Sequence, residues 1–444
     1  MEQHLDLEEL LLKGSAVQIA ALIRFIHPVD VLDILHKHED IAQEILSKLP
    51  DEMIGAIIDE EEAEDKYDLL KGFTRTHQKT ILEEMSSDEI TDMIGTLDDE
   101  EGKDVFNILD KENQEDVRQL LSYDPDSAGG IMTTEFIGIY DNKTVLKTLE
   151  YLKNECQDVE MATYIYVMSR DMELRGVLSL RNLVFSSFDT PISTITNHNV
   201  ISIDVDMDQE EVANMFDKYG FMMMPVVDKE NKILGVITID DILEVIKEEA
   251  SEDIHHMAGL AKEERVDGTI LESVKSRLPW LIINLLTALL ASAVIDLFQG
   301  TISQVVALSA VMTIVSGMGG NAGTQSLTII VRGLSLGELT KENAKQILLK
   351  ELSVGIINGL VIAFFVSILA LYYEFNIMFG VIAGIAMVLN MIMANLSGYF
   401  VPVVLEKMKI DPALASGVFV TTVTDVLGFL FFLGLATLFM PYLV

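Results

Sequence analysis

The sequence predicts a multi-domain membrane protein, with an all-α cytoplasmic N-terminal domain, an α/β domain, a connecting helix and a five-helix transmembrane domain. Three observations lead to this prediction. Long uncharged runs are confined to the C-terminal part. Almost all of the formal net charge of −39 lies ahead of them, because residues 279–444 contain only eight acidic and six basic residues. An internal α/β repeat separates these two parts. The expected domains are residues 1–127, 128–246, 247–275 and 276–444.

The strongly acidic N-terminal part limits the classes of partner. Its surface repels nucleic acid and suits cations or basic partners, so we expect no nucleic-acid partner. The chain has one cysteine, Cys156, which excludes an intramolecular disulfide and gives no sign of a thiolate metal site. The first residues contain neither a basic region nor an apolar segment, so we predict no signal peptide.

Five apolar runs each reach the ~20 residues that cross about 30 Å of hydrocarbon. They lie at about 279–298, 302–331, 352–373, 375–405 and 413–441. The basic residues near their ends all fall on one side: Lys275, Arg277, Arg332, Lys341, Lys345, Lys350, Lys407 and Lys409. By the positive-inside rule, this side is cytoplasmic. We therefore expect a multi-pass protein of the plasma membrane, surrounded by membrane lipid, with its N-terminus in the cytoplasm and its C-terminus outside.

Residues 1–127 have the pattern of short amphipathic helices. Apolar residues such as Leu11, Ile19 and Leu22 recur at helical spacing. Later helices are expected to begin at Ser86-Ser-Asp-Glu and at Asp98-Asp-Glu-Glu, where side-chain oxygens can cap the first turn and acids suit the helix dipole. The pattern alone favours a helical scaffold whose acids form a solvated face.

An internal repeat follows the helical domain. Residues 164–184 align without gaps on residues 223–243, which lie 59 residues later. Each copy has an apolar strand, a polar turn, a second strand that contains Gly-Val, and the start of a helix. This pattern resembles a tandem pair of CBS modules, at about 132–186 and 191–246. CBS pairs are regulatory domains that frequently bind adenine nucleotides.

The resemblance to CBS modules implies a nucleotide-binding position in the second copy. Thr238 and Asp241 stand where members of that family contact phosphate and ribose. The first copy has Ser179 and Asn182 at these positions, so we expect at most one good nucleotide site. Two interpretations remain open, namely ATP as a regulatory ligand and a purely structural pair.

The connecting segment, residues 247–275, is predicted to be a helix. At 3.6 residues per turn, Glu249, Glu252 and Asp253 share one face. The segment is interpreted either as an exposed linker helix or as a gating helix beneath the mouth of a pore. His255 and His256 are adjacent and should point in different directions, so we assign neither a role as a metal ligand.

The second apolar run is rich in glycine and polar residues. Four glycines lie within residues 317–323, and each would weaken a helix in water by about 1 kcal/mol. Inside a membrane, glycines let backbones approach closely or let carbonyls turn toward a water-filled path. Spacings of three and four place these polar residues in one stripe: Asn321, Thr324, Gln325 and Thr328. We predict that the stripe lines a conduit, whereas Gly355 and Gly359 form a GxxxG pattern typical of helix packing.

The last 32 residues of the chain contain a single charged residue, Asp425. A charge at the centre of a membrane helix costs roughly 2.5–3.5 kcal/mol on insertion scales. On its helix, Asp425 lies along the same side as Gly417, Thr421 and Gly428, which indicates a wet protein interior. No lysine, arginine or histidine lies at a comparable depth in any of the five runs. A cation from solution is therefore the expected partner of this carboxylate.

The donor atoms around Asp425 favour a hard cation. Carboxylate, carbonyl, hydroxyl and amide oxygens occupy the polar stripes, without thiolates, histidines or a thioether cluster. Mg²⁺ sheds water reluctantly and usually uses one or two carboxylates. A symmetric dimer that brought two copies of Asp425 to one axis would place two carboxylates around one hydrated Mg²⁺. The runs also lack the nucleophile–base sets of an enzyme, so we predict a non-enzymatic protein.

The order of the domains and three motifs make the chain similar to the MgtE family of magnesium channels and transporters. The motifs are Arg277-Leu-Pro-Trp280, Gly319-Gly-Asn-Ala-Gly-Thr-Gln-Ser326, and Asp411-Pro-Ala-Leu-Ala-Ser416 followed by Thr424-Asp-Val-Leu-Gly428. The resemblance implies a homodimer with a pore on its two-fold axis, where Asp425 and the backbone near Thr421 form the ion site. The residues expected to line this pore are Asn321, Thr324, Gln325, Gly417 and Gly428.

The resemblance also implies regulatory Mg²⁺ sites in the cytoplasmic part. Their ligands would be Asp88, Asp92, Asp208, Glu210, Asp241, Glu244, Glu249, Glu252 and Asp253. The expected function is Mg²⁺-selective uptake through a pore that closes when intracellular Mg²⁺ occupies these acids. The alternative is a Na⁺- or H⁺-coupled exchanger of divalent cations, in which Asp425 would titrate.

Overall fold

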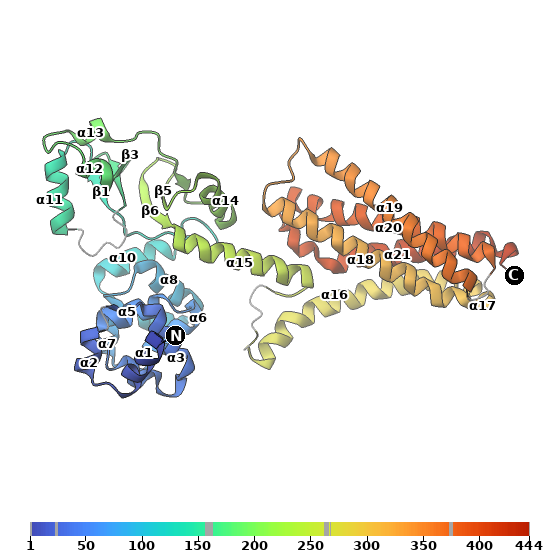
Figure 1. Ribbon diagram of the computed structural model, residues 1–444, viewed down its shortest axis with the longest axis horizontal. Helices are drawn as coiled ribbons and strands as arrows, with labels where there is room; N and C mark the ends of the chain where they lie inside the picture. Colours follow the sequence, from blue (N-terminus) through green and yellow to red (C-terminus); the bar gives the residue numbers. More distant parts are fainter. Residues whose placement is uncertain are drawn as a thin grey trace. The chain divides into compact units, whose positions relative to one another are not determined.

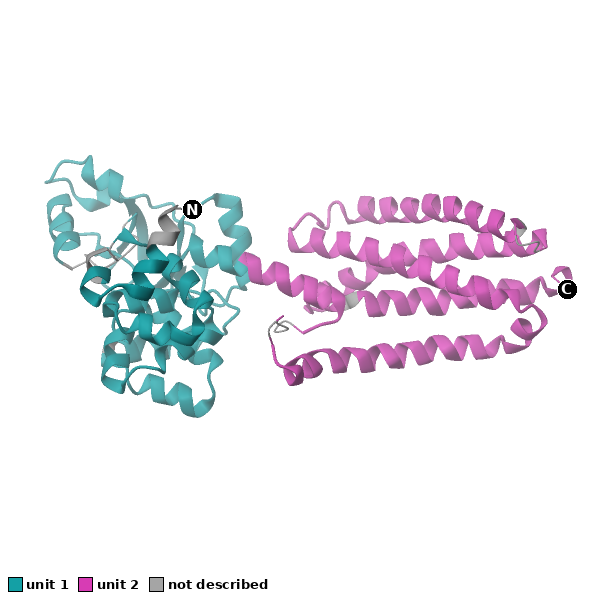
Figure 2. Ribbon diagram, turned by 60° about the horizontal axis from the view of Figure 1, so that its bottom comes forward, with its two compact units in different colours: residues 1–245 teal, residues 246–444 magenta. Residues whose placement is uncertain are grey.

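The computed structural model describes residues 2–22, 25–155, 163–261, 266, 268–372 and 376–443, so the single cysteine, Cys156, lies outside the described residues. The chain forms two compact units, Met1–Val245 and Ile246–Val444 (Figure 1, Figure 2). We call them the N-terminal unit and the C-terminal unit. Strands occur in the first, whereas the described residues of the second form helices and their connections.

The N-terminal unit begins with the predicted short helices, whose apolar faces share one core that extends from Leu7 to Val117. The helices are α1 (Glu2–Lys13), α2 (Ala16–Leu22), α3 (Pro28–Lys37), α4 (Ala42–Leu46), α5 (Asp51–Asp59), α6 (Ala63–Leu70), α7 (Arg75–Leu82), α8 (Ser87–Thr96), α9 (Asp99–Phe106) and α10 (Lys111–Leu120). The helix start predicted at Asp98 is confirmed, because its side chain accepts hydrogen bonds from the backbone N–H groups of Glu100 and Glu101. Ser86 precedes α8, but its side chain forms no capping hydrogen bond.

The repeat forms two three-stranded sheets of the same design (Figure 1). The first contains β1 (Gly138–Tyr140), β2 (Tyr164–Met168) and β3 (Leu174–Ser179), and the second contains β4 (Ile203–Asp204), β5 (Met223–Val227) and β6 (Ile233–Thr238). In each sheet the first pair of strands is parallel and the second pair is antiparallel. Tyr164 pairs with Ser179 in the first, and Met223 pairs with Thr238 in the second. These pairs are equivalent positions of the repeat. The helices of the repeat are α11 (Val145–Glu155), α12 (Leu180–Val184), α13 (Ile192–Ile195) and α14 (Gln209–Tyr219).

Backbone hydrogen bonds join the two copies at equivalent positions. The N–H of Leu174 donates to the carbonyl of Asn231 at 2.9 Å, and the N–H of Ile233 donates to the carbonyl of Met172 at 3.1 Å. Met172 and Asn231 both have left-handed backbones, with φ of 65° and 60°. Since a left-handed non-glycine residue is uncommon, its occurrence at both equivalent turns shows a shared local design. The two copies are therefore related by a pseudo-two-fold axis.

A helix, α15 (Ile239–Ala258), follows the second sheet and continues into the C-terminal unit. The single helix predicted over residues 247–275 is wrong in its extent. The helix ends at Ala258 because Gly259 takes a left-handed φ of 73°, which a glycine adopts without strain. The next helix begins after Thr269, whose side chain accepts from the N–H of Glu272, while the Glu272 side chain accepts from the N–H of Thr269.

The C-terminal unit contains five long helices among its described residues: α16 (Ile270–Leu297), α18 (Ala307–Ser335), α19 (Ala344–Tyr372), α20 (Ile377–Lys407) and α21 (Ser416–Leu438). Four of them are long and apolar enough to cross a membrane. The exception is α18, which is as long as α19 but carries the glycines and the polar stripe. The start predicted at residue 302 also differs, because residues 299–304 form a separate helix, α17 (Gln299–Gln304). There the side chains of Ser303 and Gln304 both donate to the carbonyl of Gly300.

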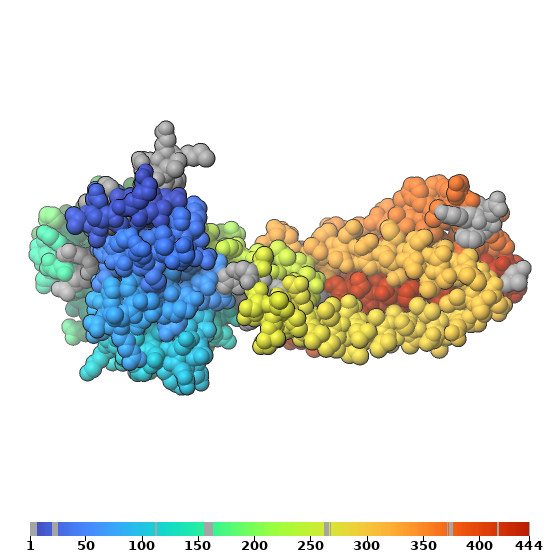
Figure 3. All heavy atoms as spheres, turned by 90° about the horizontal axis from the view of Figure 1, so that it is seen from below, coloured from blue at the N-terminus to red at the C-terminus, as the bar shows by residue number. Residues whose placement is uncertain are grey.

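Helix α20 packs against α18, α19 and α21, and among the described residues of this unit it holds more buried residues than any other helix. Glycines permit the closest approaches. An added Cβ at Gly355 would lie 3.0 Å from the Met391 carbonyl oxygen, and one at Gly359 would lie 3.0 Å from the Val388 Cα. The packing role predicted for the GxxxG pattern is confirmed. On the face shown in Figure 3, part of α21 is visible at the surface between α16 and α18.

Candidate cation sites

Helices α18 and α21 pack against each other, and successive turns of the two helices are in contact around Asp425. Ser316 donates a hydrogen bond from its hydroxyl to the Asp425 carboxylate. One turn along, an added Cβ at Gly320 would lie 3.4 Å from the Thr421 side chain. One turn further, an added Cβ at Gly417 would lie 3.7 Å from the Thr324 hydroxyl oxygen. Steps of four residues on each helix therefore place these three contacts in one continuous row.

Asp425 is half-buried on this row. In the part of the chain that the structure describes, no lysine, arginine or histidine forms an ion pair with it. The sequence did not predict Ser316 as a partner, although Ser316 opens the glycine-rich segment. The carbonyl of Thr421 accepts from the Thr424 hydroxyl at 2.9 Å, and a carbonyl oxygen has a second lone pair for another partner. Asp425 and Thr421 thus present acceptor oxygens without a fixed cation.

Gly428 packs against a buried amide of α20. An added Cβ there would lie 2.8 Å from the side-chain nitrogen of Asn390, and one at Gly319 would lie 2.2 Å from the same atom. Asn390 is completely buried on α20 and donates to the carbonyl of Val315 at 2.8 Å. Gly428 therefore serves close packing around Asn390 in the single chain, and its place in the pore lining stays a prediction from the family resemblance.

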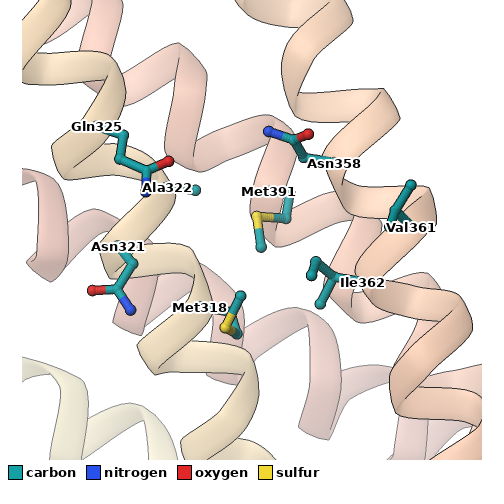
Figure 4. A pocket seen from close by; sticks show the side chains of 8 residues that line it. All are labelled: Met318, Asn321, Ala322, Gln325, Asn358, Val361, Ile362 and Met391. Carbon is teal, nitrogen blue, oxygen red and sulfur yellow. The ribbon is translucent and has the colours of Figure 1, made fainter.

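The polar stripe of α18 lies on the exposed side of this single chain. Asn321, Thr324, Gln325 and Thr328 are all exposed. Asn321 and Gln325 also line a cavity of about 200 Å³ (Figure 4) together with Met318, Ala322, Asn358, Val361, Ile362 and Met391. Asn358 comes from α19 and brings a third amide to this cavity. Asn358 was not predicted as a lining residue, because it lies inside the GxxxG pattern of Gly355 and Gly359.

A second acid of the C-terminal unit is buried and was also missed. Glu351 of α19 is 3% exposed. One of its carboxylate oxygens accepts from the Ser326 hydroxyl at 2.8 Å and from the Asn395 amide at 3.3 Å. The other oxygen lies 3.9 Å from the Lys350 ammonium nitrogen. Because these partners satisfy the carboxylate, Glu351 ties α18, α19 and α20 together.

A cluster of acids lies inside the N-terminal unit, where α8 approaches the start of α15. Four of the predicted ligands lie close enough for their charges to act on one another: Asp88, Asp92, Asp241 and Glu244. Burial raises the pKa of Asp92 to about 8 and the pKa of Asp241 to about 7. The neighbouring charges of Glu89 and Asp88 add to the effect on Asp92. Several carboxyls that lie close together and are partly removed from water are difficult to ionise together.

Three further members of this cluster were not predicted: Asp59, Glu89 and Lys66. Burial raises the pKa of Asp59 and of Glu89. Lys66 is almost fully buried; its ammonium donates to the Asp59 backbone carbonyl at 2.6 Å and lies 2.7 Å from the Glu89 carboxylate. One carboxylate oxygen of Asp59 and one of Asp88 are buried and accept no hydrogen bond from the described residues. An unsatisfied buried acceptor is costly, and a cation would satisfy both.

The remaining predicted residues have identifiable structural roles. Asp208 caps α14, since its side chain accepts from the N–H of Glu210 at 2.9 Å. Thr238 donates its hydroxyl and its N–H to the carboxylate of Asp241, so the two residues proposed to contact a nucleotide bond to each other. This capping arrangement also fixes the start of α15.

The end of α15 belongs to the C-terminal unit, and it packs there through the helix face that the sequence predicted. Glu249, Glu252 and Asp253 are half-buried, and His256, one turn on, is buried. The Ser335 hydroxyl donates to the Asp253 carboxylate at 3.2 Å, and burial raises the pKa of Asp253. Nδ1 of His256 lies 2.8 Å from a carboxylate oxygen of Asp411. The sequence assigned neither histidine a role as a metal ligand, and it did not predict that His256 pairs with Asp411.

These features define a helical membrane protein with an acidic N-terminal unit, of the kind that transports cations. Comparison with protein families agrees: a family described as divalent cation transporter matches residues 312–435, the MgtE intracellular N domain matches residues 26–126, and the CBS domain matches residues 192–248. The magnesium transporters MgtE of Bacillus subtilis and Thermus thermophilus are each 32% identical to this chain, over 447 and 452 residues, and 99% of both chains is covered in each case. The chain belongs to the MgtE family of magnesium transporters.

Two solved structures resemble the N-terminal part of the chain. One is the crystal structure of the cytosolic domain of the Mg²⁺ channel MgtE in complex with ATP, which is 32% identical with a TM-score of 0.51 and covers 55% of this chain and 99% of that one. The other is the soluble part of a magnesium transporter, 33% identical with a TM-score of 0.53, which covers 56% of this chain and 98% of that one. Both the family resemblance drawn from the motifs and the predicted fold class are confirmed. Members of this family are transporters and not enzymes.

Proposed function

We propose that the protein mediates Mg²⁺-selective uptake across the plasma membrane, through a path that contains Asp425. The observation that carries this proposal is the environment of Asp425, a carboxylate in an apolar helix that accepts a hydrogen bond from the Ser316 hydroxyl. An ion pair within the described residues does not stabilise it, so a mobile cation would. Oxygen donors suit a hard ion that keeps its water, and the full-length relatives are magnesium transporters.

The exposed polar row of α18 and α21 supports a homodimer as the working form. The hydroxyls of Thr324 and Thr328 donate to carbonyls of their own helix, but in hydrocarbon the exposed amides of Asn321 and Gln325 would lack partners among the described residues. A second copy related by a two-fold axis would cover this row with its own. Two Asp425 carboxylates would then face one hydrated Mg²⁺ on the axis, with the Thr421 carbonyls close by. The orientation proposed for this dimer places the acidic N-terminal unit in the cytoplasm.

The acid cluster of the N-terminal unit supports closure by intracellular Mg²⁺. At low Mg²⁺ its carboxyls repel one another or hold protons, and both conditions disfavour the compact arrangement in which Asp88 meets Asp241. Mg²⁺ would bind the free oxygens of Asp59 and Asp88 and hold the cluster together. Because Asp241 and Asp253 lie on the same helix, α15, a shift at the cluster would move its other end. Closure then follows from the greater affinity of Mg²⁺ for the compact state.

ATP is proposed as a second regulator, at the second CBS copy. The support is the related cytosolic domain that was solved with ATP. Thr238 and Asp241 are engaged with each other here, so a nucleotide would have to compete with this bond. Because Asp241 also belongs to the acid cluster, bound ATP would alter the Mg²⁺ concentration at which the path closes.

The test is Mg²⁺ entry into proteoliposomes that contain a trapped indicator and have no other ion gradient. Entry with the wild type that is lost with Asp425→Asn supports a passive Mg²⁺ path through Asp425. A wild type that transports Mg²⁺ only when a Na⁺ or proton gradient is imposed would replace this proposal with the coupled exchanger. Closure is tested separately by raising Mg²⁺ on the side that faces the N-terminal unit. A flux that does not change would contradict the gating proposal, but it would not contradict the proposal of a path through Asp425.

A further inference from the structure

We propose that a hollow among the last helices of the helical part of the N-terminal unit binds a free amino acid with an aromatic or branched apolar side chain. The hollow lies where α8 packs against α9 and α10, and its volume is about 360 Å³. We call it the α9 hollow. Pockets that hold small molecules in proteins have volumes of about 300–1,000 Å³, so this one can hold a single amino acid. None of the predicted Mg²⁺ ligands is among the residues that line it.

The floor of the α9 hollow is apolar. It is formed by four side chains near the ends of three helices: Ile94, Leu97, Phe106 and Leu121. The first three pack on the core of the helical part but are only partly buried, and Leu121 is exposed. An apolar side chain of a ligand would remove the remaining surface from water, which is favourable in proportion to the area that it covers.

Two cationic side chains line the hollow in this strongly acidic unit. The guanidinium carbon of Arg118 lies 5.3 Å from the centre of the Phe106 ring, and Lys103 lines the same hollow. Neither cation forms an ion pair with the described residues, whereas Lys71 and Arg75 of the same helical part each have an acidic partner. A guanidinium that lies over a ring keeps its N–H groups in its own plane, where they can bind a carboxylate through two parallel hydrogen bonds.

Acidic side chains supply the second charge that an amino acid requires. Asp98 and Asp99, at the start of α9, line the hollow together with Asn107. One carboxylate oxygen of Asp98 accepts from the N–H groups of Glu100 and Glu101, which holds the carboxylate in place. These bonds lower the pKa of Asp98, so it is ionised at neutral pH. Its other oxygen can accept from the ammonium group of a ligand.

The combination of charges and apolar floor selects the class of ligand. An anion without an amino group would be repelled by the two acids, and an amine without a carboxylate would be repelled by the two cations. A zwitterion with an apolar side chain satisfies all three features: its ammonium group meets an acid, its carboxylate meets the guanidinium, and its side chain meets the floor.

A ligand in the α9 hollow would act on a helix that also belongs to the acid cluster. Helix α8 carries Asp88 and Asp92 ahead of Ile94, so one helix links the cluster to the hollow. A bound amino acid would therefore shift the Mg²⁺ concentration at which the path closes. This consequence rests on the proposed closure by Mg²⁺, whereas the binding itself does not, and it can be measured without any flux.

The test is the binding of tritiated L-phenylalanine to the purified full-length protein in detergent, measured by scintillation proximity at a constant Mg²⁺ concentration. We expect saturable binding, with competition by unlabelled L-phenylalanine and L-leucine. Three compounds each lack one of the recognised features: 3-phenylpropionate has no amino group, phenethylamine has no carboxylate, and glycine has no apolar side chain. Each should compete at least about tenfold less well than L-phenylalanine, because it loses one set of contacts.

Arg118→Gln should weaken the binding of L-phenylalanine by about tenfold or more, because the carboxylate loses its charged partner. Arg75→Gln is the matched control, since Arg75 is an exposed arginine of α7 that pairs with Asp104 and does not line the hollow. It should bind like the wild type. The proposal is overturned by a wild type without saturable binding, by equal binding to wild type and Arg118→Gln, or by 3-phenylpropionate that competes as well as L-phenylalanine.

Discussion

The acid cluster of the N-terminal unit and the Asp425 site of the C-terminal unit both leave carboxylate oxygens for a cation, but they do so differently. In the cluster several acids lie close together, and loss of hydration raises the pKa of Asp92 to about 8 and of Asp241 to about 7. At Asp425 one acid lies among hydroxyl and carbonyl oxygens, and Ser316 donates to it. The number of charges is the main difference between the two sites.

This difference corresponds to two tasks that one kind of ligand can serve. A conducting site must bind an ion well enough for it to enter and weakly enough for it to leave. One carboxylate per chain among neutral oxygens meets this condition. A sensing site instead has to hold its ion until the concentration falls, and several carboxylates with unsatisfied oxygens give the tighter grip. The comparison predicts that substitutions in the two places have effects of different kind and size.

The largest effect is expected at Asp425. A unit charge about 4 Å from another contributes about 4 kcal/mol at an effective dielectric constant of 20, and each 1.36 kcal/mol is tenfold in rate. Asp425→Asn should therefore reduce Mg²⁺ flux at least about a hundredfold. Ser316→Ala removes a hydrogen bond to a charged group, worth about 1.5–3 kcal/mol, and should reduce flux by about tenfold or more while conduction persists. The measurement is Mg²⁺ entry into proteoliposomes.

A contrary result would be a Ser316→Ala variant as inactive as Asp425→Asn. That outcome would mean that Ser316 takes part in ion binding directly and does more than orient the carboxylate. The control is Gly317→Ala, next to Ser316 on α18. An added Cβ at Gly317 has no atom within 4 Å, so alanine should be tolerated there. Gly317→Ala should leave flux close to that of the wild type.

The next effect concerns the lysine inside the acid cluster. Lys66 is buried, and removing one partner of a buried ion pair costs about 3–5 kcal/mol because the other charge is left uncompensated. Lys66→Met should lower the unfolding free energy by about this amount in chelator. Mg²⁺ should recover part of the loss, since it would stand in for the ammonium group. The measurement is denaturant unfolding of the full-length protein, followed with and without Mg²⁺.

Lys71→Met is the control for this experiment. Lys71 pairs with Asp68 on the surface, where both side chains are more than half exposed, and exposed pairs contribute about 0–1 kcal/mol. Equal losses in the two variants would show that the charge of Lys66 does not compensate the cluster. In that case the comparison between a crowded and a solitary carboxylate site would lose its energetic basis.

A third and smaller effect is a pH dependence of closure that the conducting site does not impose. The raised pKa values of Asp92 and Asp241 mean that these carboxyls hold protons below about pH 7–8 in the compact state. The separated carboxyls stay ionised over this range, so a proton that binds only in the compact state stabilises that state. Protons then take over part of the role of Mg²⁺, and the Mg²⁺ concentration for half-closure should fall between pH 8 and pH 6.

The check is flux measured against Mg²⁺ at several pH values in the same liposomes. Asp92→Asn removes the group with the highest of these pKa values and should flatten the dependence. A half-closure concentration that stays constant from pH 8 to pH 6 would show that the cluster is not the sensor.

The sequence carried local signals well and distant contacts poorly. The helix start at Asp98, the strands within each copy of the repeat and Asp425 were predicted because each signal depends on residues close along the chain. The bonds from the N–H groups of Glu100 and Glu101 to Asp98 are an example. The partners of the missed residues lie far along the chain. His256 meets Asp411 across 155 residues, and Glu351 meets Asn395 across 44. No periodicity reports such contacts, and a charged residue on a short helix has the same local pattern whether it is solvated or buried.

The acid cluster shows how these two kinds of information combine. The family resemblance supplied Asp88, Asp92, Asp241 and Glu244, and the structure brought them together. It could not supply Asp59, Glu89 or Lys66, whose pattern on α5, α6 and α8 is that of a solvated face. Burial, which only the tertiary structure sets, turns these residues into part of a site.

The smallest effect expected concerns Asp208, where the structure separates two roles that the sequence left together. Asp208 caps α14, and asparagine caps a helix about as well as aspartate, so Asp208→Asn should leave the unfolding free energy nearly unchanged. Asp208→Ala removes the cap and should cost about 0.5–2 kcal/mol. If Asp208 is also a regulatory ligand, Asp208→Asn should raise the Mg²⁺ concentration for half-closure, because the charge is lost while the fold is kept. If only Asp208→Ala shifts closure, in proportion to its loss of stability, Asp208 acts as a cap alone and the sensor is confined to the buried cluster.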